Sequence, residues 1–147
     1  MIGPIVNSDR SCNGDVFSIS LPVRISSVED GRLALMSYLE PFALDDRVIN
    51  RIEVVLEELL SNVVRHAEGA DKLSIEAECA DHAVRLAIED NGVAFNPLVA
   101  SEPEPFADLE NATLGRLGIP LIRRLSQSVS YDRIGPVNRV SAVITAG

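Results

Sequence analysis

Two polar residues four positions apart, Glu58 and Asn62, have the types and the spacing for phosphate chemistry. They lie in a stretch whose apolar residues recur at helical spacing, so about one turn of helix separates them on the same side. An amide oxygen is a hard ligand that suits Mg²⁺, and a carboxylate one turn away can orient or deprotonate an attacking hydroxyl or water. The structural alternative is a solvated glutamate beside a polar residue at the edge of the core.

A second motif, Asp90-Asn91-Gly92, follows an apolar stretch that alternates like a strand. An aspartate there could accept a hydrogen bond from an exocyclic amine in a dry pocket. Gly92 would let a flat ligand approach the backbone. An ordinary Asx turn uses the same residue types, so both interpretations stay open.

A third motif, Gly115-Arg116-Leu117-Gly118, precedes an apolar helical stretch. Free N–H groups and the helix dipole at a helix start favour an anion, and glycines allow a phosphate to come close. A flexible joint between a loop and a helix also explains these glycines.

Hydrophobic periodicity predicts the elements that would position these motifs. Alternation predicts strands over 15–25, Lys72–Ala80, Ala83–Asp90, Ser128–Arg133 and Arg139–Ala146. Helical spacing predicts helices over Val28–Phe42, from an N-cap at Asp45 or Asp46 to about Ala67, and from Gly115 to about Gln127. The long middle helix turns one apolar arc toward the sheet, made of Val48, Ile52, Val55, Leu56, Leu59, Leu60 and Val63.

The order of these elements predicts the fold class. Short turns between strands favour a mixed, mostly antiparallel sheet with the helices on one face, which is an α+β two-layer sandwich. Residues 1–14 are expected to form a flexible leader and residues 15–147 a single domain. The long segment 93–114 is expected to be functional or disordered, because loops of this length are uncommon inside compact domains.

Composition limits the classes of partner. The chain has 147 residues, 46% of them hydrophobic, and 13 basic against 22 acidic residues give a formal net charge of −9. This balance argues against binding nucleic acid or anionic lipid. We expect a cytoplasmic protein with no membrane span and no signal peptide. Cys12 and Cys79 are expected to be free thiols in a reducing compartment.

Taken together and in this order, the three motifs resemble the GHKL family of ATP-binding domains, which have the Bergerat fold. The resemblance extends over roughly residues 17–144 and is strongest to stand-alone bacterial anti-sigma-factor serine kinases of the RsbW and SpoIIAB type. The stretches that carry it are VVLEELLSNVVRHA (54–67), IEDNGVAFNPL (88–98) and LGRLGIPLIRRLSQSVSYDR (114–133).

The resemblance implies a role for each matching residue. Glu58 matches the catalytic base and Asn62 the Mg²⁺ ligand of the family. Asp90 matches the aspartate that reads adenine, Gly92 the glycine under the base, and 93–114 the ATP lid. The remaining residues that it places in ATP binding are Arg65, Phe95, Gly115, Arg116, Leu117 and Gly118.

Three departures from the family pattern concern the phosphate end of the site. The lid has no Lys or Arg, although the family's kinases commonly place a basic residue there, and it carries Glu102, Glu104, Asp108 and Glu110. Arg116 stands in a glycine-rich position, where it could clash with phosphate or supply the missing charge. Ala94 stands where a glycine is common, so the start of the lid is expected to be stiffer.

The resemblance implies an ATP-binding anti-sigma factor that is also a protein-serine kinase. Such a protein holds a sigma factor and phosphorylates an anti-sigma antagonist in a partner-switching pathway. The alternative is a catalytically weak, ATP-gated protein-binding module, which the acidic lid favours and Glu58 opposes. Homodimerisation is a tendency of the family. The sequence leaves open the partner's identity, the retention of phosphotransfer, the order of the lid and the oligomeric state.

Overall fold

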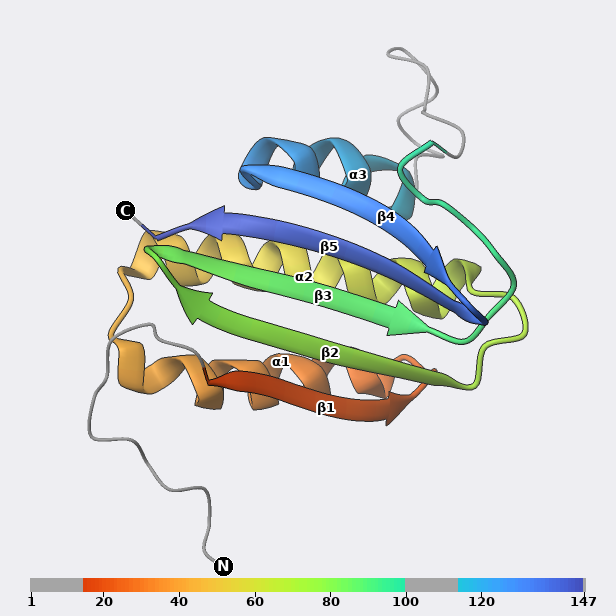
Figure 1. The fold of residues 1–147 in the computed structure, drawn as a ribbon, viewed down its shortest axis with the longest axis horizontal. Helices are drawn as coiled ribbons and strands as arrows, with labels where there is room; N and C mark the ends of the chain where they lie inside the picture. Colours follow the sequence, from red (N-terminus) through yellow and green to blue (C-terminus); the bar gives the residue numbers. More distant parts are fainter. Residues whose placement is uncertain (1–14, 100–113, 147) are drawn as a thin grey trace, which may run out of the picture.

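A computed structural model describes residues 15–99 and 114–146, with side chains described from residue 119 onward in the second range. The predicted leader and residues 100–113 of the predicted lid lie outside the described residues. The elements are, in chain order, β1 (Val16–Pro22), α1 (Ser26–Leu39), a short 3-10 helix η1 (Glu40–Phe42), α2 (Asp46–His66), β2 (Lys72–Ala80), β3 (Ala83–Asp90), α3 (Leu114–Leu125), β4 (Ser128–Ile134) and β5 (Val137–Thr145) (Figure 1).

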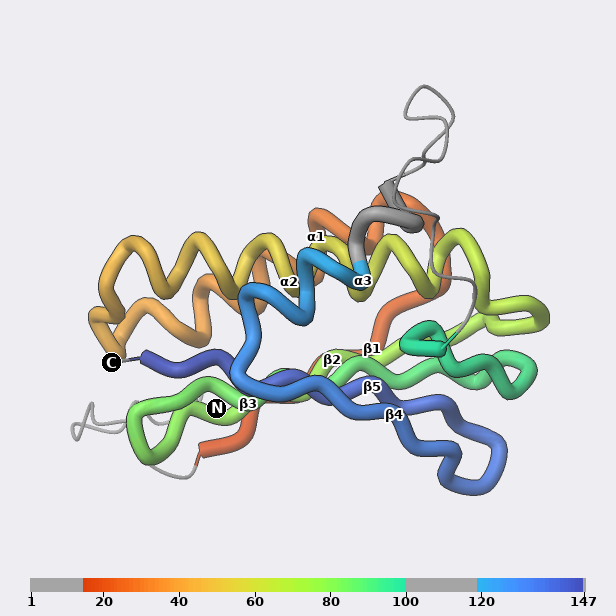
Figure 2. Tube along the Cα trace, turned by 90° about the horizontal axis from the view of Figure 1, so that it is seen from above, coloured from red at the N-terminus to blue at the C-terminus, as the bar shows by residue number. Residues whose placement is uncertain are grey.

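The five strands form one sheet in the order β1-β2-β3-β5-β4. All four pairings between these described strands are antiparallel, so the parallel pairing that a mixed sheet implies is not found among them. Figure 2 shows α1, α2 and α3 on the same side of the sheet. The predicted α+β two-layer sandwich is therefore confirmed, and element ends differ from the prediction by about one to three residues.

The long helix α2 forms as its sequence predicts. The side chain of Asp45 accepts a hydrogen bond from the backbone N–H of Arg47 at 2.8 Å, which satisfies a free donor of the first turn. The predicted apolar arc is buried, except that Val63 is only half-buried. Asn62 is buried beside this arc, with 8% of its surface exposed. No helix in the described ranges has both the length and the apolarity to cross a bilayer.

Alternation along the two central strands decides which side chains face the helices. Val84, Leu86 and Ile88 of β3 are buried, as are Val140, Ala142 and Ile144 of β5. Asp90 continues the first row and Asn138 begins the second, so both polar residues point toward the helix layer at one end of the sheet. The two residues are direct partners in the β3–β5 register.

The prediction of two free thiols is wrong for Cys79. This residue is fully buried at the end of β2 and is disulfide-bonded. The prediction used the expected redox state of the compartment and took no account of geometry, which is what decides whether two sulfurs can meet. Cys12 lies outside the described residues.

Gly31 sets how closely α1 approaches the sheet. A Cβ at this position would lie 2.5 Å from Cδ1 of Ile75 and 3.1 Å from Cδ1 of Leu60, and both of those side chains are fully buried. Helix and sheet can therefore pack at this separation only because residue 31 has no side chain.

We expect Gly31→Val to lower the free energy of unfolding by about 3 kcal/mol, because the added atoms must displace core side chains. Urea unfolding followed by circular dichroism measures the loss. Ser37→Val on the exposed side of the same helix is the matched control, and we expect it to change stability by less than about 0.5 kcal/mol. Equal losses in the two variants would contradict the packing argument.

Candidate functional site

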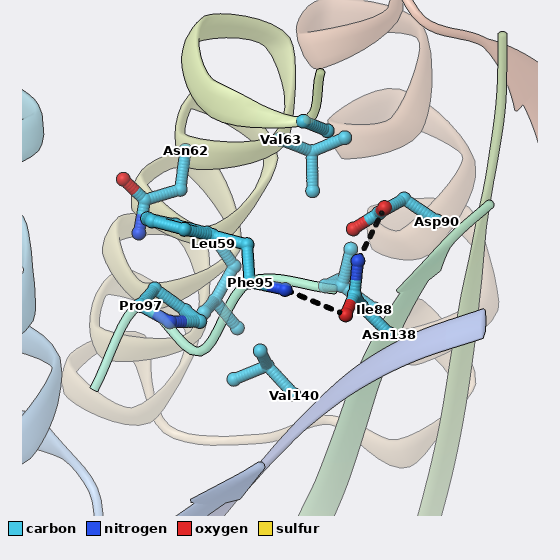
Figure 3. Close-up of a pocket in the computed structure, with 10 residues that line it drawn as sticks. Leu59, Asn62, Val63, Ile88, Asp90, Phe95, Pro97, Asn138 and Val140 are labelled. Atoms are coloured by element: carbon cyan, nitrogen blue, oxygen red, sulfur yellow. Dashed lines mark hydrogen bonds between the residues drawn. The ribbon is translucent and has the colours of Figure 1, made fainter. Parts of the chain in front are cut away.

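An apolar pocket lies between α2 and the adjoining ends of β3 and β5, and part of the segment that follows β3 closes it (Figure 3). Three polar side chains, Asn62, Asp90 and Asn138, reach its walls. Apolar walls with a few convergent polar groups are typical of a small-molecule site. The lining residues are Leu59, Asn62, Val63, Ala67, Ile88, Asp90, Phe95, Pro97, Asn138 and Val140.

The Asp90 carboxylate has one oxygen that is already occupied. Its Oδ1 accepts hydrogen bonds from the backbone N–H of Gly92 at 2.9 Å and from Nδ2 of Asn138 at 3.0 Å. The second oxygen accepts no hydrogen bond within the described residues, and Figure 3 shows it on the side of the pocket. Since a carboxylate can only accept, this oxygen suits an amine donor on a ligand.

Gly92 is needed for a reason that the sequence did not reveal. A Cβ at this position would lie 2.8 Å from the backbone oxygen of Glu68 and 3.1 Å from Oδ1 of Asp90. The neighbouring Val93 donates its N–H to the same Glu68 oxygen at 2.9 Å. Gly92 therefore lets the turn after β3 pack against the turn after α2, and its predicted place under a base stays a prediction.

The Asn62 amide makes no hydrogen bond to any part of the chain that the structure describes, and its polar atoms are not fully buried, although the residue as a whole is 8% exposed. The amide is therefore open on the pocket wall and is a candidate to bind a ligand. No cluster of three or more His, Cys, Asp or Glu that could hold a metal occurs among the described residues. A magnesium ion here would therefore take the Asn62 oxygen together with phosphate and water ligands, a donor set that Mg²⁺ accepts.

Glu58 is half-buried one turn before Asn62 on α2. Desolvation by burial, with a smaller contribution from the charge of Glu57, raises the pKa of Glu58, and the positive charge of Arg65 partly offsets the rise. A raised pKa brings a carboxylate nearer to the strength that a general base needs at neutral pH. Arg65 itself is exposed, so its influence on the site within the described residues is electrostatic.

The glycine-rich motif lies in α3, and the helix begins one residue before the predicted start at Gly115. The helix begins at Leu114, so Gly115, Arg116, Leu117 and Gly118 occupy its first turns. Their side chains lie outside the described set, and the predicted roles of Arg116 and Leu117 stay predictions. The later part of α3 forms a hydrogen bond with the segment after β3: Nη2 of Arg123 donates to the backbone oxygen of Leu98 at 3.2 Å.

The pocket is small in this structure. Its cavity volume is about 20 Å³, enough for about one water molecule. Phe95 lies at its edge with its ring centroid 6.0 Å from that of His66, and Pro97 lines the same side. A nucleotide base can therefore enter only if the segment that carries Phe95 and Pro97 moves outward.

The most connected polar residue of the pocket, Asn138, is absent from the set of residues predicted from the sequence. Its amide touches Asp90 and the backbone of the segment that closes the pocket. The signal that could have found it is the pairing of β3 with β5. Both strands were predicted. On each strand the inward-facing apolar residues are continued by one polar residue, Asp90 on β3 and Asn138 on β5, and pairing of the two strands would bring these two polar side chains into contact.

Sequence comparisons place these motifs in a known family. The family described as "Histidine kinase-like ATPase domain" matches residues 21–144. The serine/threonine-protein kinase BtrW of Bordetella bronchiseptica is 33% identical over 105 residues, which cover 65% of this chain and 72% of that protein. The serine-protein kinase RsbW of Listeria innocua is 25% identical over 127 residues, which cover 80% of this chain and 81% of that protein.

Solved structures show the same fold. The crystal structure of the RsbU and RsbW domains of Rv1364c from Mycobacterium tuberculosis matches 90% of this chain with a TM-score of 0.65 and 15% sequence identity. The match spans 32% of that longer chain, so the likeness concerns one of its domains. The family match over residues 21–144, with distant relatives among the RsbW and BtrW serine kinases, leads to one conclusion: the chain belongs to the histidine kinase-like ATPase domain family, whose members bind ATP.

Proposed function

We propose that this chain is an ATP-dependent protein-serine kinase that also acts as an anti-sigma factor in a partner-switching pathway. The observation that carries the proposal is the Asp90 carboxylate, which lies in an apolar pocket with one oxygen fixed by Gly92 and Asn138 and the other left for a ligand. That arrangement suits the exocyclic amine of adenine. The open amide of Asn62 lines the same pocket from α2.

The roles of the remaining residues follow from their chemistry. Glu58 accepts the proton of a serine hydroxyl on the substrate protein. The serine oxygen attacks the γ-phosphorus of ATP, and the bond between that phosphorus and the oxygen of the leaving ADP breaks. The raised pKa of Glu58 supports this use as a base. Asn62 holds a magnesium ion, which neutralises phosphate charge when bound. Gly115 and Gly118 lie in the first turns of α3, where backbone N–H groups favour phosphate.

The proposed partners are a sigma factor and a small antagonist that carries the acceptor serine. Relatives named RsbW and BtrW are described as serine or serine/threonine kinases, which supports the kinase part of the proposal. The formal net charge of −9 would suit a basic patch on a partner.

A second candidate function is an ATP-gated binding module without phosphotransfer. The small volume of the pocket favours it, because a nucleotide base would have to displace the segment that carries Phe95 and Pro97. Since Arg123 of α3 holds Leu98 of that segment, the displacement would reach α3 as well. Nucleotide binding would thereby change the surface that a partner meets.

Titration with Mg·ATP by calorimetry tests whether the chain binds ATP, which both candidate functions require. We expect saturable binding by the wild type and a loss of about tenfold or more in Asn62→Ala, because the metal loses its ligand from the protein. Asn50→Ala, on the exposed side of the same helix, is the matched control and should bind like the wild type. A wild type that does not bind Mg·ATP would overturn the proposed function.

Transfer of labelled γ-phosphate to candidate antagonist proteins separates the two functions. We expect Glu58→Gln to keep ATP affinity within about threefold and to slow transfer by about 100-fold or more, because it removes the base. Replacing the acceptor serine of the antagonist by alanine controls for the site of transfer. ATP binding without transfer by the wild type would favour the gated binding module.

The same substitution should also change how stability depends on pH. The folded protein raises the pKa of Glu58, so it binds that proton more tightly than the unfolded chain does. The contribution of Glu58 to stability is then fully present below the unfolded pKa and is lost as the pH rises through the folded pKa. We therefore expect Glu58→Gln to gain thermal stability relative to the wild type between about pH 4 and about pH 7.

Thermal unfolding at each pH measures this difference. Glu40→Gln, at an exposed position whose charge is not among the causes of the raised Glu58 pKa, controls for the loss of one acidic charge. A difference between Glu58→Gln and the wild type that shrinks with rising pH would show that the folded protein does not disfavour the Glu58 carboxylate.

A further inference from the structure

The side-chain amide of Asn138 is the centre of a hydrogen-bond network that joins three segments of the chain. Its Oδ1 accepts from the backbone N–H of Phe95 at 3.1 Å, from the hydroxyl of Tyr131 at 2.6 Å and from Nη1 of Arg133 at 3.2 Å. Its Nδ2 donates to Oδ1 of Asp90 at 3.0 Å and to the backbone oxygen of Val93 at 2.9 Å. With 3% of its surface exposed, the residue is buried.

These partners fix the orientation of the amide. Three donors converge on its oxygen and two acceptors on its nitrogen, so a flipped amide would face donors with donors and acceptors with acceptors. Arg133 lies directly opposite Asn138 in the register of β4 and β5, and Tyr131 lies two residues earlier on the same face of β4. The arginine also donates to the backbone oxygen of Gly92 at 2.8 Å.

The fixed amide determines what the Asp90 carboxylate can do. Because Oδ1 of Asp90 already accepts from Asn138 and Gly92, the plane of the carboxylate is set and the other oxygen is the one on the pocket side. A ligand amine placed there gains a hydrogen bond to a charged acceptor. A ligand carbonyl placed there meets a negatively charged oxygen, which repels it.

We propose that Asn138 is a positioning residue that sets the selectivity of the pocket for purines with an exocyclic amine, and that the Tyr131 hydroxyl holds Asn138 in place for this task. The inference rests on the proposed binding of ATP. Neither residue needs to touch the nucleotide, since both act through the orientation of Asp90. Without the hydrogen bond from Asn138, the Asp90 carboxylate can rotate. It then binds a ligand amine less strongly and repels a ligand carbonyl less strongly, so the pocket discriminates less between the two.

The test compares the affinities for ATP and for inosine triphosphate, which differ in the amine and the carbonyl at one ring position. Calorimetry gives the ratio of the two affinities for each variant. We expect Asn138→Ala to lower the ratio by about tenfold, as for one hydrogen bond to a charged group. We expect Tyr131→Phe to lower it by about threefold, because one of the hydrogen bonds that fix the amide is lost while the others remain.

The control is the same substitution at the other tyrosine of the chain. The Tyr38 hydroxyl donates to the backbone oxygen of Asp15 at 2.6 Å and accepts from the N–H of Cys79 at 3.2 Å, so Tyr38→Phe also removes a hydrogen-bonded hydroxyl. It lies away from the pocket and should leave the ratio unchanged. Thermal unfolding identifies the folded variants, and Tyr131→Phe decides the matter if Asn138→Ala does not fold.

Each outcome has a distinct meaning. A wild type that binds no ATP overturns the proposed function, and this inference with it. A wild type that binds ATP and inosine triphosphate equally well shows that Asp90 does not read the amine. Variants that lose both affinities in parallel, or that keep the wild-type ratio, overturn the positioning role of Asn138 and Tyr131, while ATP binding by the wild type leaves the proposed function standing.

Discussion

The contact between Asp90 and Asn138 is the interaction on which the rest of the site depends. It joins the last residue of β3 to an early residue of β5 inside the sheet register, where both side chains face the helix layer. A buried carboxylate needs partners to be tolerated, and here a backbone N–H and an amide supply them. The same amide also forms hydrogen bonds with the backbone of Val93 and Phe95, so the segment after β3 that lines the pocket is held against β5.

The helix α2 contributes to the core and to the candidate site at once. Its apolar arc supplies much of the core, and its polar edge carries Glu58 and Asn62 at the boundary of that core. Burial raises the pKa of Glu58 and leaves the Asn62 amide without a partner in the described chain. The first effect disfavours the folded state, and a stronger base beside an open amide is what phosphate chemistry requires. Groups that a fold tolerates at some cost are often the functional ones.

Most of the fold could be predicted from the sequence, because its local signals agree with one another. The Asp45 cap, the arc of α2 and the alternation in β2 and β3 each appear where the pattern places them. The site was predicted less completely. Asp90 and Asn62 lie together as expected, but the network around Asn138 depends on which strands pair, and that is a non-local property. The disulfide at Cys79 was missed because the prediction used the expected redox state of the compartment instead of geometry.

The nearly filled pocket has a consequence for how affinity can change between related chains. For a base that must displace the Phe95–Pro97 segment, the observed dissociation constant is the intrinsic one divided by the fraction of molecules in which the segment is open. Substitutions in that segment would then alter binding strength through the fraction of open molecules. Because the backbone N–H of Phe95 donates to Asn138, the same substitutions also reach the residue that orients Asp90, so the strength of binding and the choice of ligand are coupled in this fold.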